Sequence, residues 1–229
     1  MDGVILVDKP IGWTSFDVVA KIRGNLRRIT GNKGIKVGHA GTLDPMATGL
    51  LIVLTGKMTK QQDLYMKKDK VYEAKVILGA RSDTDDAEGV ITESKVEGQK
   101  TKVEIEQALK EFVGEIEQMP PQYSAIKLNG QKAYDIARRG EKAELKLRKI
   151  TVHSIDDIEV FDNKVSFKCH VSSGTYIRSI ARDLGEKLGC GGYLSSLRRT
   201  SIGDFDITKA LAVSELTDEI LQKSVATTE

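Results

Sequence analysis

The stretch at residues 38–45 places a single carboxylate in a setting suited to chemistry. It reads GHAGTLDP, with Asp44 directly before Pro45 and with His39 in the same stretch. Proline disfavours the helical conformation at Asp44, and the two glycines permit backbone angles that other residues avoid. The apolar run LLIVL follows at residues 50–54. This order indicates a reactive group on a loop beside a rigid core, although Asp and Gly are also common in ordinary turns.

The positive charge of the chain is concentrated in two segments. The net charge is only +2, yet residues 17–36 carry six basic side chains against one acidic, and residues 127–149 carry eight against three. Local basic clusters are typical of surfaces that bind nucleic acid. They also occur as plain solvated faces, so this pattern alone leaves both interpretations open.

Composition excludes several classes of protein. The 229 residues, with 40% hydrophobic and 30% charged side chains, are typical of a globular protein with one large or two small domains. No apolar run approaches the roughly 20 residues that span a bilayer, and the first residues, MDG, do not have the basic character expected at the start of a signal peptide. We therefore expect a cytoplasmic protein without a membrane partner. Cys169 and Cys190 form no CxxC pair, which predicts reduced thiols and no zinc site.

Two partial motifs do not indicate a cofactor. Residues 49–57 resemble a phosphate-binding loop, but the glycine spacing is too long and Met58 follows the lysine. Residues 83–86 read DTDD, without the glycine and terminal glutamate of a calcium-binding loop. We expect neither a metal nor a nucleotide cofactor.

Hydrophobic periodicity predicts an α+β fold with antiparallel strand pairing, because several strands follow one another without intervening helices. The expected strands are residues 3–7, 72–78, 155–161 and 165–171, the last two joined by a hairpin turn at Asp162 and Asn163. The expected helices are one capped by Ser15 with an apolar face at Phe16, Val19, Ile22, Leu26 and Ile29, one opened by a capping box at residues 101–104 and ending near Gly114, one ending at Arg138–Gly140, and one over residues 177–188 ending at Gly189. Asn129 and Gly130 predict a tight turn.

Six motifs cover nearly the whole chain. They are KPIGWTS from Lys9, GHAGTLDPMATGLL from Gly38, KVYEA from Lys70, PPQYSA from Pro120, GTYIR from Gly174 and LRR from Leu197. In content and order they resemble the TruB-type tRNA pseudouridine-55 synthases.

The resemblance implies a large mixed, mainly antiparallel sheet with flanking helices and a central RNA-binding cleft. We expect one catalytic domain over residues 1–229, with a basic RNA-clamping insertion at about residues 120–150. Bacterial relatives usually carry a C-terminal PUA domain, which we do not expect in this chain. The implied reaction flips uridine 55 out of the tRNA T-loop, breaks its N1–C1′ bond and rejoins the base through C5. The alternative is an RNA-binding or tRNA-folding protein whose modification activity is incidental.

The resemblance also assigns catalytic roles. Asp44 is the expected catalytic carboxylate, which could attack C1′, stabilise charge there or remove the C2′ proton. Arg178 is the expected partner that orients Asp44 through a bidentate pair, although its position alone also suits a surface arginine. Tyr72 is expected to stack on the target base or to move a proton at C5, although a strand aromatic is also typical of a core.

The remaining expected site residues bind substrate. His39 is expected to fill the space left by the flipped nucleotide, and Lys9 to support the catalytic loop. The uracil pocket is expected to include Tyr176 and Leu197, and Arg138 and Arg139 belong to the basic insertion. The expected partner is the T-arm stem-loop of tRNA, bound by a monomer that needs no guide RNA and no cofactor.

Overall fold

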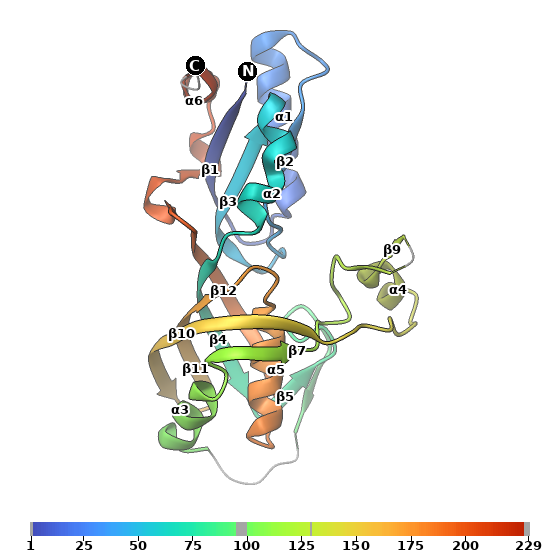
Figure 1. Cartoon of the computed structure of the whole chain (residues 1–229), viewed down its shortest axis with the longest axis vertical. Helices are drawn as coiled ribbons and strands as arrows, with labels where there is room; N and C mark the ends of the chain where they lie inside the picture. The colour runs from blue at the N-terminus through green and yellow to red at the C-terminus, as the bar shows by residue number, and fades with distance from the viewer. Residues whose placement is uncertain (1, 95–99, 129, 227–229) are drawn as a thin grey trace. The chain divides into compact units, whose positions relative to one another are not determined.

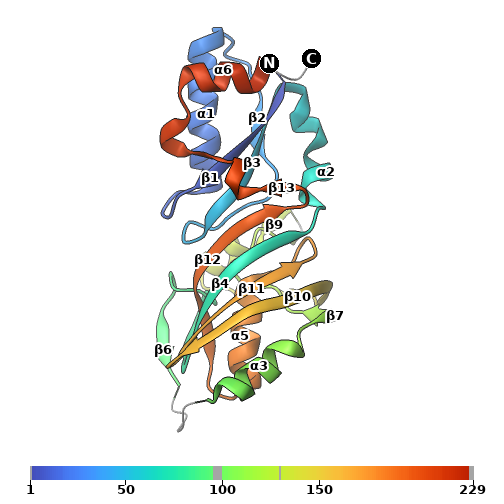
Figure 2. The same cartoon turned by 90° about the vertical axis from the view of Figure 1, so that its left-hand side faces the viewer.

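The computed structural model describes residues 2–94, 100–128 and 130–226. The chain divides into two compact units, which are described separately below and whose elements are labelled in Figure 1 and Figure 2. Unit 1 comprises Met1–Tyr72 and Leu197–Glu229, and unit 2 comprises Glu73–Ser196. The expected central cleft and the single catalytic domain stay predictions.

Unit 1 contains a mixed sheet in the order β14-β1-β3-β12, with β2 added on β3 and β13 on β12. Its strands are β1 (Gly3–Lys9), β2 (Val37–His39), β3 (Thr48–Thr55), the end of β12 (Gly192–Ile202), β13 (Phe205–Asp206) and β14 (Leu211–Ala212). The longest pairing is antiparallel, with β1 from Gly3 to Lys9 lying against β3 from Thr55 to Gly49. The β1–β14 and β3–β12 pairings are parallel.

Helical segments lie on both faces of this sheet, and an apolar cluster fills each face. The helices of unit 1 are α1 (Ser15–Thr30), α2 (Gln62–Met66) and α6 (Asp218–Ala226), with 3-10 turns η1 (Gly56–Gln61), η2 (Ile207–Lys209) and η3 (Val213–Glu215). One core cluster joins Ile22 and Leu26 of α1 and Leu221 of α6 to alternate residues of β1 and β3. A second cluster lies on the opposite face of β3, around Ile52.

The start of α1 differs from the prediction in two ways. The N-cap is Thr14, whose side chain accepts from the Asp17 N–H in a capping box, rather than Ser15. The Ser15 hydroxyl is instead hydrogen-bonded to Leu43. Phe16 lies outside the buried face, with 61% of its surface exposed. The predicted apolar face is therefore wrong at Phe16.

Unit 2 contains a mainly antiparallel sheet in the order β4-β11-β10-β7. Its strands are β4 (Lys70–Leu78, whose first three residues belong to unit 1), β7 (Gly114–Gln118), β10 (Arg148–Phe161) and β11 (Lys164–Val171). Two separate hairpins join β5 (Ala80–Ser82) to β6 (Ile91–Glu93) and β8 (Lys127–Leu128) to β9 (Gln131–Lys132). The predicted hairpin between β10 and β11 is confirmed, and Asp162 at its turn has φ 53°. The predicted strand over residues 72–78 is confirmed within β4.

The helices of unit 2 are α3 (Lys102–Lys110), α4 (Ala133–Arg138) and α5 (Ile177–Lys187). The capping box at Thr101 is confirmed, although α3 ends before the predicted Gly114. The predicted ends of α4 and α5 are confirmed, and both are followed by a glycine with positive φ. Residue 129 of the predicted tight turn lies outside the described residues. In Figure 1, α4 and β9 project from the rest of unit 2.

These elements confirm the predicted α+β class with a mainly antiparallel sheet. Within the described ranges, no helix has the length and apolar character needed to cross a membrane.

Candidate active site

The loop that carries Asp44 joins β2 to β3 in unit 1, and its backbone is tied to its surroundings. The Gly12 N–H donates to the Pro45 carbonyl at 2.8 Å, and the Lys9 ammonium lies 3.5 Å from the same oxygen. The Ala47 N–H donates to the carbonyl of Asp44 at 3.1 Å. Lys9 is fully buried. A lysine is almost never fully buried unless its ammonium has partners, and the Pro45 carbonyl is one of them here. The KPIGWTS motif therefore lies against the residue that follows the carboxylate.

Ser15 fixes the other side of Asp44. Its buried hydroxyl donates to the Leu43 carbonyl at 3.0 Å and accepts from the Leu43 N–H at 2.8 Å. Both backbone groups of the residue before Asp44 are thus satisfied by one side chain at the start of α1. A loop held in this way can present its carboxylate in a fixed position.

Arg199, which was not among the predicted site residues, holds the backbone at the start of this loop. Arg199 is 1% exposed, and its guanidinium donates to three backbone carbonyls. Nη2 lies 3.0 Å from the Gly41 oxygen, Nη1 lies 3.4 Å from the Thr42 oxygen, and Nε lies 2.8 Å from the Leu50 oxygen. One side chain thus connects the start of the catalytic loop to the core strand β3.

The LRR motif reaches the loop because β12 pairs in parallel with the start of β3. Arg198 lies opposite Thr48 and Arg199 opposite Gly49 in this register. A Cβ on Gly49 would lie 2.3 Å from the Arg199 carbonyl oxygen, so only glycine permits this approach. Leu197, predicted to line the uracil pocket, is buried at the same end of the pairing.

Basic groups near Arg199 are biased toward their neutral forms. Burial and the Arg199 cation lower the pKa of His39, whose Nδ1 is buried without a hydrogen-bond partner in the described structure. Burial and the same cation lower the pKa of Lys70 from 10.5 to about 8. Lys70 donates to the carbonyls of Met66 and Lys68. A neutral imidazole at His39 suits a stacking role better than a role as a fixed cation.

Tyr72 shares a buried face of β4 with Lys70. Burial alternates along this strand, and Lys70, Tyr72 and Ala74 are on the buried side. The ring is therefore positioned by strand alternation, with a phenol that can act in proton transfer.

Arg178 lies in the first turn of α5 in unit 2, and acceptors of that unit hold its guanidinium. It forms a buried ion pair with Asp86 at 3.3 Å. Nη1 donates to the Thr84 carbonyl at 3.1 Å, and Nη2 donates to the Tyr123 carbonyl at 2.8 Å. The PPQYSA motif, through Tyr123, and the DTDD turn at residues 83–86, through Thr84 and Asp86, thus fix the plane of this guanidinium.

A second ion pair lies one helical turn along α5. Arg182 lies 2.9 Å from Asp85, and burial raises the pKa of Asp85 to about 6 against the opposing effect of Arg182. The residue before α5 is also anchored, because Tyr176 exchanges two backbone hydrogen bonds with the buried Gln118 side chain, at 2.9 and 3.0 Å. The start of α5 is therefore rigidly placed within unit 2.

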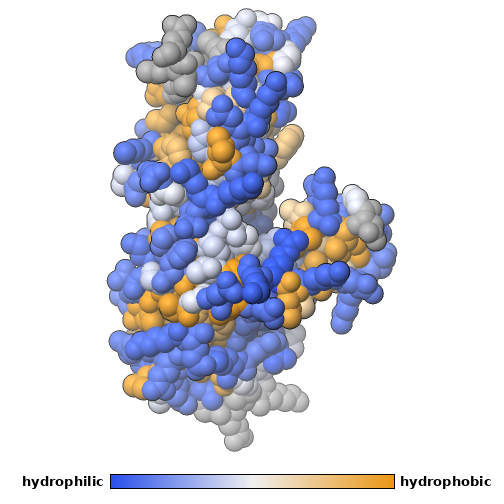
Figure 3. Space-filling model, viewed as in Figure 1, coloured by the Kyte–Doolittle hydropathy of each residue, from blue (hydrophilic) through white to orange (hydrophobic). Residues whose placement is uncertain are grey.

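Arg138 and Arg139 are exposed at the end of α4. Arg139 pairs with Glu141 at 2.9 Å, and the Arg138 guanidinium lies 5.3 Å from the centre of the Tyr134 ring. Figure 3 shows hydrophilic side chains along the outer edge of this projecting part of unit 2. Both arginines are accessible to a ligand.

The predicted residues therefore fall into two groups. Unit 1 holds His39, Asp44, Lys9, Tyr72 and Leu197, and unit 2 holds Arg178, Tyr176, Arg138 and Arg139. The pairing of Asp44 with Arg178 and the roles of all these residues stay predictions. Sequence reasoning missed Ser15, Arg199, Gln118 and Asp86, although Arg199 stands in the LRR motif and Asp86 in the acidic run DTDD.

Comparison with known families gives two matches that together cover most of the chain. Residues 27–177 match the TruB family pseudouridylate synthase N-terminal domain. Residues 178–228 match the tRNA pseudouridylate synthase B C-terminal domain.

Individual relatives are similar over nearly the full length of this chain. The chain is 46% identical to "tRNA pseudouridine synthase B" of Thermobifida fusca, covering 95% of this chain and 75% of the relative. It is 45% identical to the protein of the same name from Clostridium kluyveri, covering 98% and 75%. The match to the Phocaeicola vulgatus protein of that name has 42% identity and covers 97% and 94%.

Among solved structures, a chain of a Cbf5-Nop10-Gar1 complex is similar, with 33% identity and a TM-score of 0.69. A chain of an H/ACA RNP bound to a substrate RNA has 30% identity and a TM-score of 0.66. The matches cover 93% of this chain in both cases, and the chain spans about half the length of these structural relatives. The comparisons confirm the predicted resemblance.

Proposed function

Because the chain belongs to the TruB family of pseudouridylate synthases, we propose that it converts a tRNA uridine to pseudouridine, at position 55 of the T-loop. Membership makes the chain an isomerase. The names of its curated relatives support tRNA as the substrate.

The observation that carries the proposal is the tethering of the catalytic loop. Backbone groups on both sides of Asp44 are fixed by Ser15, Gly12 and Lys9, and the start of the loop is fixed by Arg199. A carboxylate in a fixed position can act on one carbon of a bound nucleotide, whereas a mobile one would lose most of the advantage of orientation.

The reaction breaks the N1–C1′ bond, turns the uracil and forms a bond from C5 to C1′. The hydrogen at C5 leaves and N1 gains one, so the product is an isomer of the substrate. Asp44 acts in its ionised form, by attacking C1′, by stabilising positive charge at that carbon as in glycoside hydrolysis, or by removing the C2′ proton. Tyr72 stacks on the base and serves in proton transfer at C5, and Arg178 acts with Asp44.

The target base leaves the stack before it reacts. A carboxylate cannot reach the glycosidic bond of a stacked nucleotide, so extrusion into a pocket is required. The proposed pocket includes Leu197 and Tyr176, and a neutral His39 takes the place of the base. RNA loops are where sequence is usually recognised, so the T-arm stem-loop is the proposed recognition unit.

The proposed enzyme acts in the cytoplasm as a monomer and without a guide RNA. Its curated relatives at 42–46% identity are named "tRNA pseudouridine synthase B". The structural relatives from Cbf5 complexes are less similar, at 33% and 29% identity. The identity therefore favours a stand-alone enzyme.

Replacement of Asp44 tests the proposal. Asp44→Asn should abolish isomerisation of a T-arm stem-loop while leaving its Kd nearly unchanged, because affinity comes mainly from phosphate neutralisation. Product would be mapped by base-specific chemistry and binding measured on filters with the same sample. The matched control is Asp63→Asn, at an exposed carboxylate on α2, which should keep the parental rate. Retained turnover in Asp44→Asn would refute the catalytic assignment, and a parent that binds T-arm RNA without modifying it would favour the RNA-folding alternative.

A further inference from the structure

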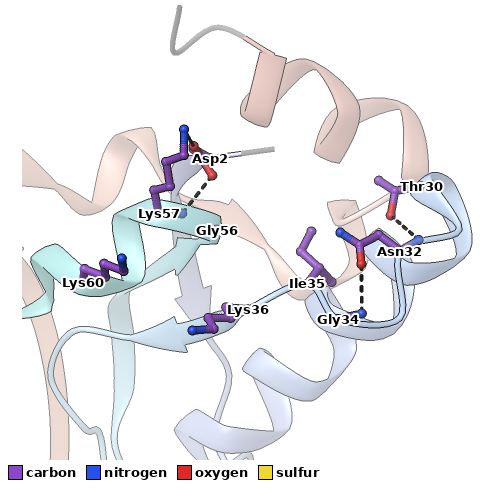
Figure 4. A pocket seen from close by; sticks show the side chains of 9 residues that line it. All are labelled: Asp2, Thr30, Asn32, Gly34, Ile35, Lys36, Gly56, Lys57 and Lys60. Atoms are coloured by element: carbon purple, nitrogen blue, oxygen red, sulfur yellow. Dashed lines mark hydrogen bonds and ion pairs between the residues drawn. The ribbon is translucent and has the colours of Figure 1, made fainter.

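A cavity of about 390 Å³ opens in unit 1, at the turn after α1 (Figure 4). Its lining comes from Asp2 near the N-terminus, from the turn that includes Asn32 and Lys36, and from η1 with Lys57 and Lys60. None of the residues assigned to the candidate active site lines it. The cavity lies at the end of the basic segment 17–36, whose charge the proposed mechanism does not use.

The cavity carries excess positive charge. Among the described residues that line it, Asp2 is the one with an acidic side chain; it accepts from the Lys57 N–H at 2.8 Å and lies 3.9 Å from the Lys57 ammonium. Lys36 and Lys60 are exposed, and neither has a carboxylate within 4.0 Å among the described residues. Figure 4 shows Lys36 beside the strand that follows the turn and Lys60 on the neighbouring 3-10 turn, and both residues line the cavity. Two ammonium groups without a carboxylate partner in one lining favour the binding of an anion there.

A side-chain amide adds a further donor. The Asn32 Oδ1 accepts from the Gly34 N–H at 2.9 Å, which determines which end of the amide faces the turn. The Nδ2 donors therefore point the other way, and Figure 4 shows this nitrogen on the side where Lys57 and Lys60 lie. The Asn32 backbone is also fixed, because its N–H donates to the Thr30 hydroxyl at 3.1 Å.

The walls of the cavity are joined to each other. The Gly56 N–H donates to the Lys36 carbonyl at 2.9 Å, directly beside the β2–β3 pairing. Ile35 is buried in the core cluster under the turn. The spacing of the two lysine backbones is thus set by the fold, although their side chains are free to adjust to a ligand.

We propose that this cavity binds a phosphodiester group of the RNA substrate, away from the target base. No aromatic side chain is among the described residues that line it, so it offers no stacking surface for a nucleobase. Ammonium and amide N–H groups are the donors that contact phosphates in nucleic-acid complexes. The inference rests on the proposed function, because it takes the anion from a tRNA backbone.

The test removes the two unpaired ammonium groups together. Lys36→Ala with Lys60→Ala should raise the Kd for unmodified tRNA by about fivefold to tenfold near physiological salt and should reduce the slope of log K against log salt by about 1. The isomerisation rate at saturating tRNA should stay at the parental value, because no catalytic residue is changed. Inorganic phosphate, titrated alone, should bind only at millimolar concentration.

The matched control is Lys164→Ala with Lys168→Ala, two exposed lysines of β11. It removes the same charge without touching the cavity. An equal change in Kd and slope for both double variants would overturn the inference, since net charge would then explain it. An unchanged slope in the cavity variant, or tight binding of free phosphate that does not compete with tRNA, would also overturn it. Failure of the proposed function is distinct: it would appear as absent product in the parent, whatever the binding data show.

Discussion

Arg199→Lys is expected to slow the reaction by disturbing the catalytic loop without weakening RNA binding. The guanidinium spans three carbonyl oxygens, at 3.0 Å for Gly41, 3.4 Å for Thr42 and 2.8 Å for Leu50. A lysine has one nitrogen in place of this fork and cannot reach all three oxygens at once. We expect it to keep one contact and to leave two buried carbonyls without their donor.

The size of the effect follows from these contacts. A hydrogen bond to a charged group contributes about 1.5 kcal/mol, so the loss of two lowers the free energy of unfolding by about 3 kcal/mol. Both lost contacts would be on the catalytic loop if the lysine stays with β3. A displacement of the reacting group by about 1 Å lowers the rate by about 100-fold. The Kd for RNA should change by less than about twofold, because Arg199 is 1% exposed.

Single-turnover isomerisation at saturating T-arm RNA, well below the unfolding temperature, measures the rate, and urea unfolding measures stability. The matched control is Arg198→Lys, the same exchange at the neighbouring residue, whose guanidinium pairs with Asp8 at 2.7 Å in a partly exposed position. Such a pair contributes about 1 kcal/mol or less, so this variant should stay within about threefold of the parental rate. A near-parental rate for Arg199→Lys, or a loss explained entirely by unfolded protein, would refute the assignment of Arg199 as a positioning residue.

Three further predictions concern other parts of the chain. Arg178→Lys should lose most activity at saturating RNA in single-turnover assays. An ammonium lacks the planar fork of the guanidinium and cannot contact Asp86 and two carbonyls at once. Near-parental rates would contradict this. Lys70 keeps its proton up to pH 10.5 when unfolded but only to about 8 when folded. The unfolding free energy of the parent, relative to Lys70→Met in urea titrations, should therefore rise by about 2 kcal/mol between these values, and a flat difference would contradict the burial argument. Hydrogen exchange should show new protection in residues 127–149 when T-arm RNA binds, and Arg138→Gln with Arg139→Gln should raise Kd more than it changes the saturated rate; strong protection without RNA would contradict a clamping role.

The parts of the fold that were predictable depend on neighbours in sequence. The capping box of α3 joins Thr101 to Glu104, three residues apart, and the turn at Asp162 joins two strands that follow each other directly. Both patterns are complete within a few residues, so no tertiary contact has to be known. The six motifs indicated the family in the same way, because each is a continuous run.

The parts that were missed depend on distant partners. Thr14 and Ser15 can both cap a helix, and the choice is decided by Leu43, which lies 28 residues along the chain and occupies the Ser15 hydroxyl. Arg199 could not be assigned a role because its acceptors are backbone carbonyls up to 158 residues away. Every residue type has a carbonyl, so such acceptors leave no trace in composition or spacing.

The turn at residues 83–86, which supplies the carboxylate partner of Arg178, depends on a backbone conformation that cannot be read from residue type alone. Consecutive side chains of an extended chain point to opposite sides, yet Asp85 pairs with Arg182 and Asp86 pairs with Arg178 on the same helix. The left-handed backbone at Asp85, with φ 62°, turns the chain so that both carboxylates reach α5. For a residue other than glycine this conformation costs about 1 kcal/mol, and the two ion pairs offset that cost. Strain of this kind concentrates where orientation matters. A glycine at position 85 would adopt this backbone conformation without the cost, but it would lack the carboxylate that pairs with Arg182. Asp85 therefore supplies both the turn that brings Asp86 to Arg178 and an ion pair of its own.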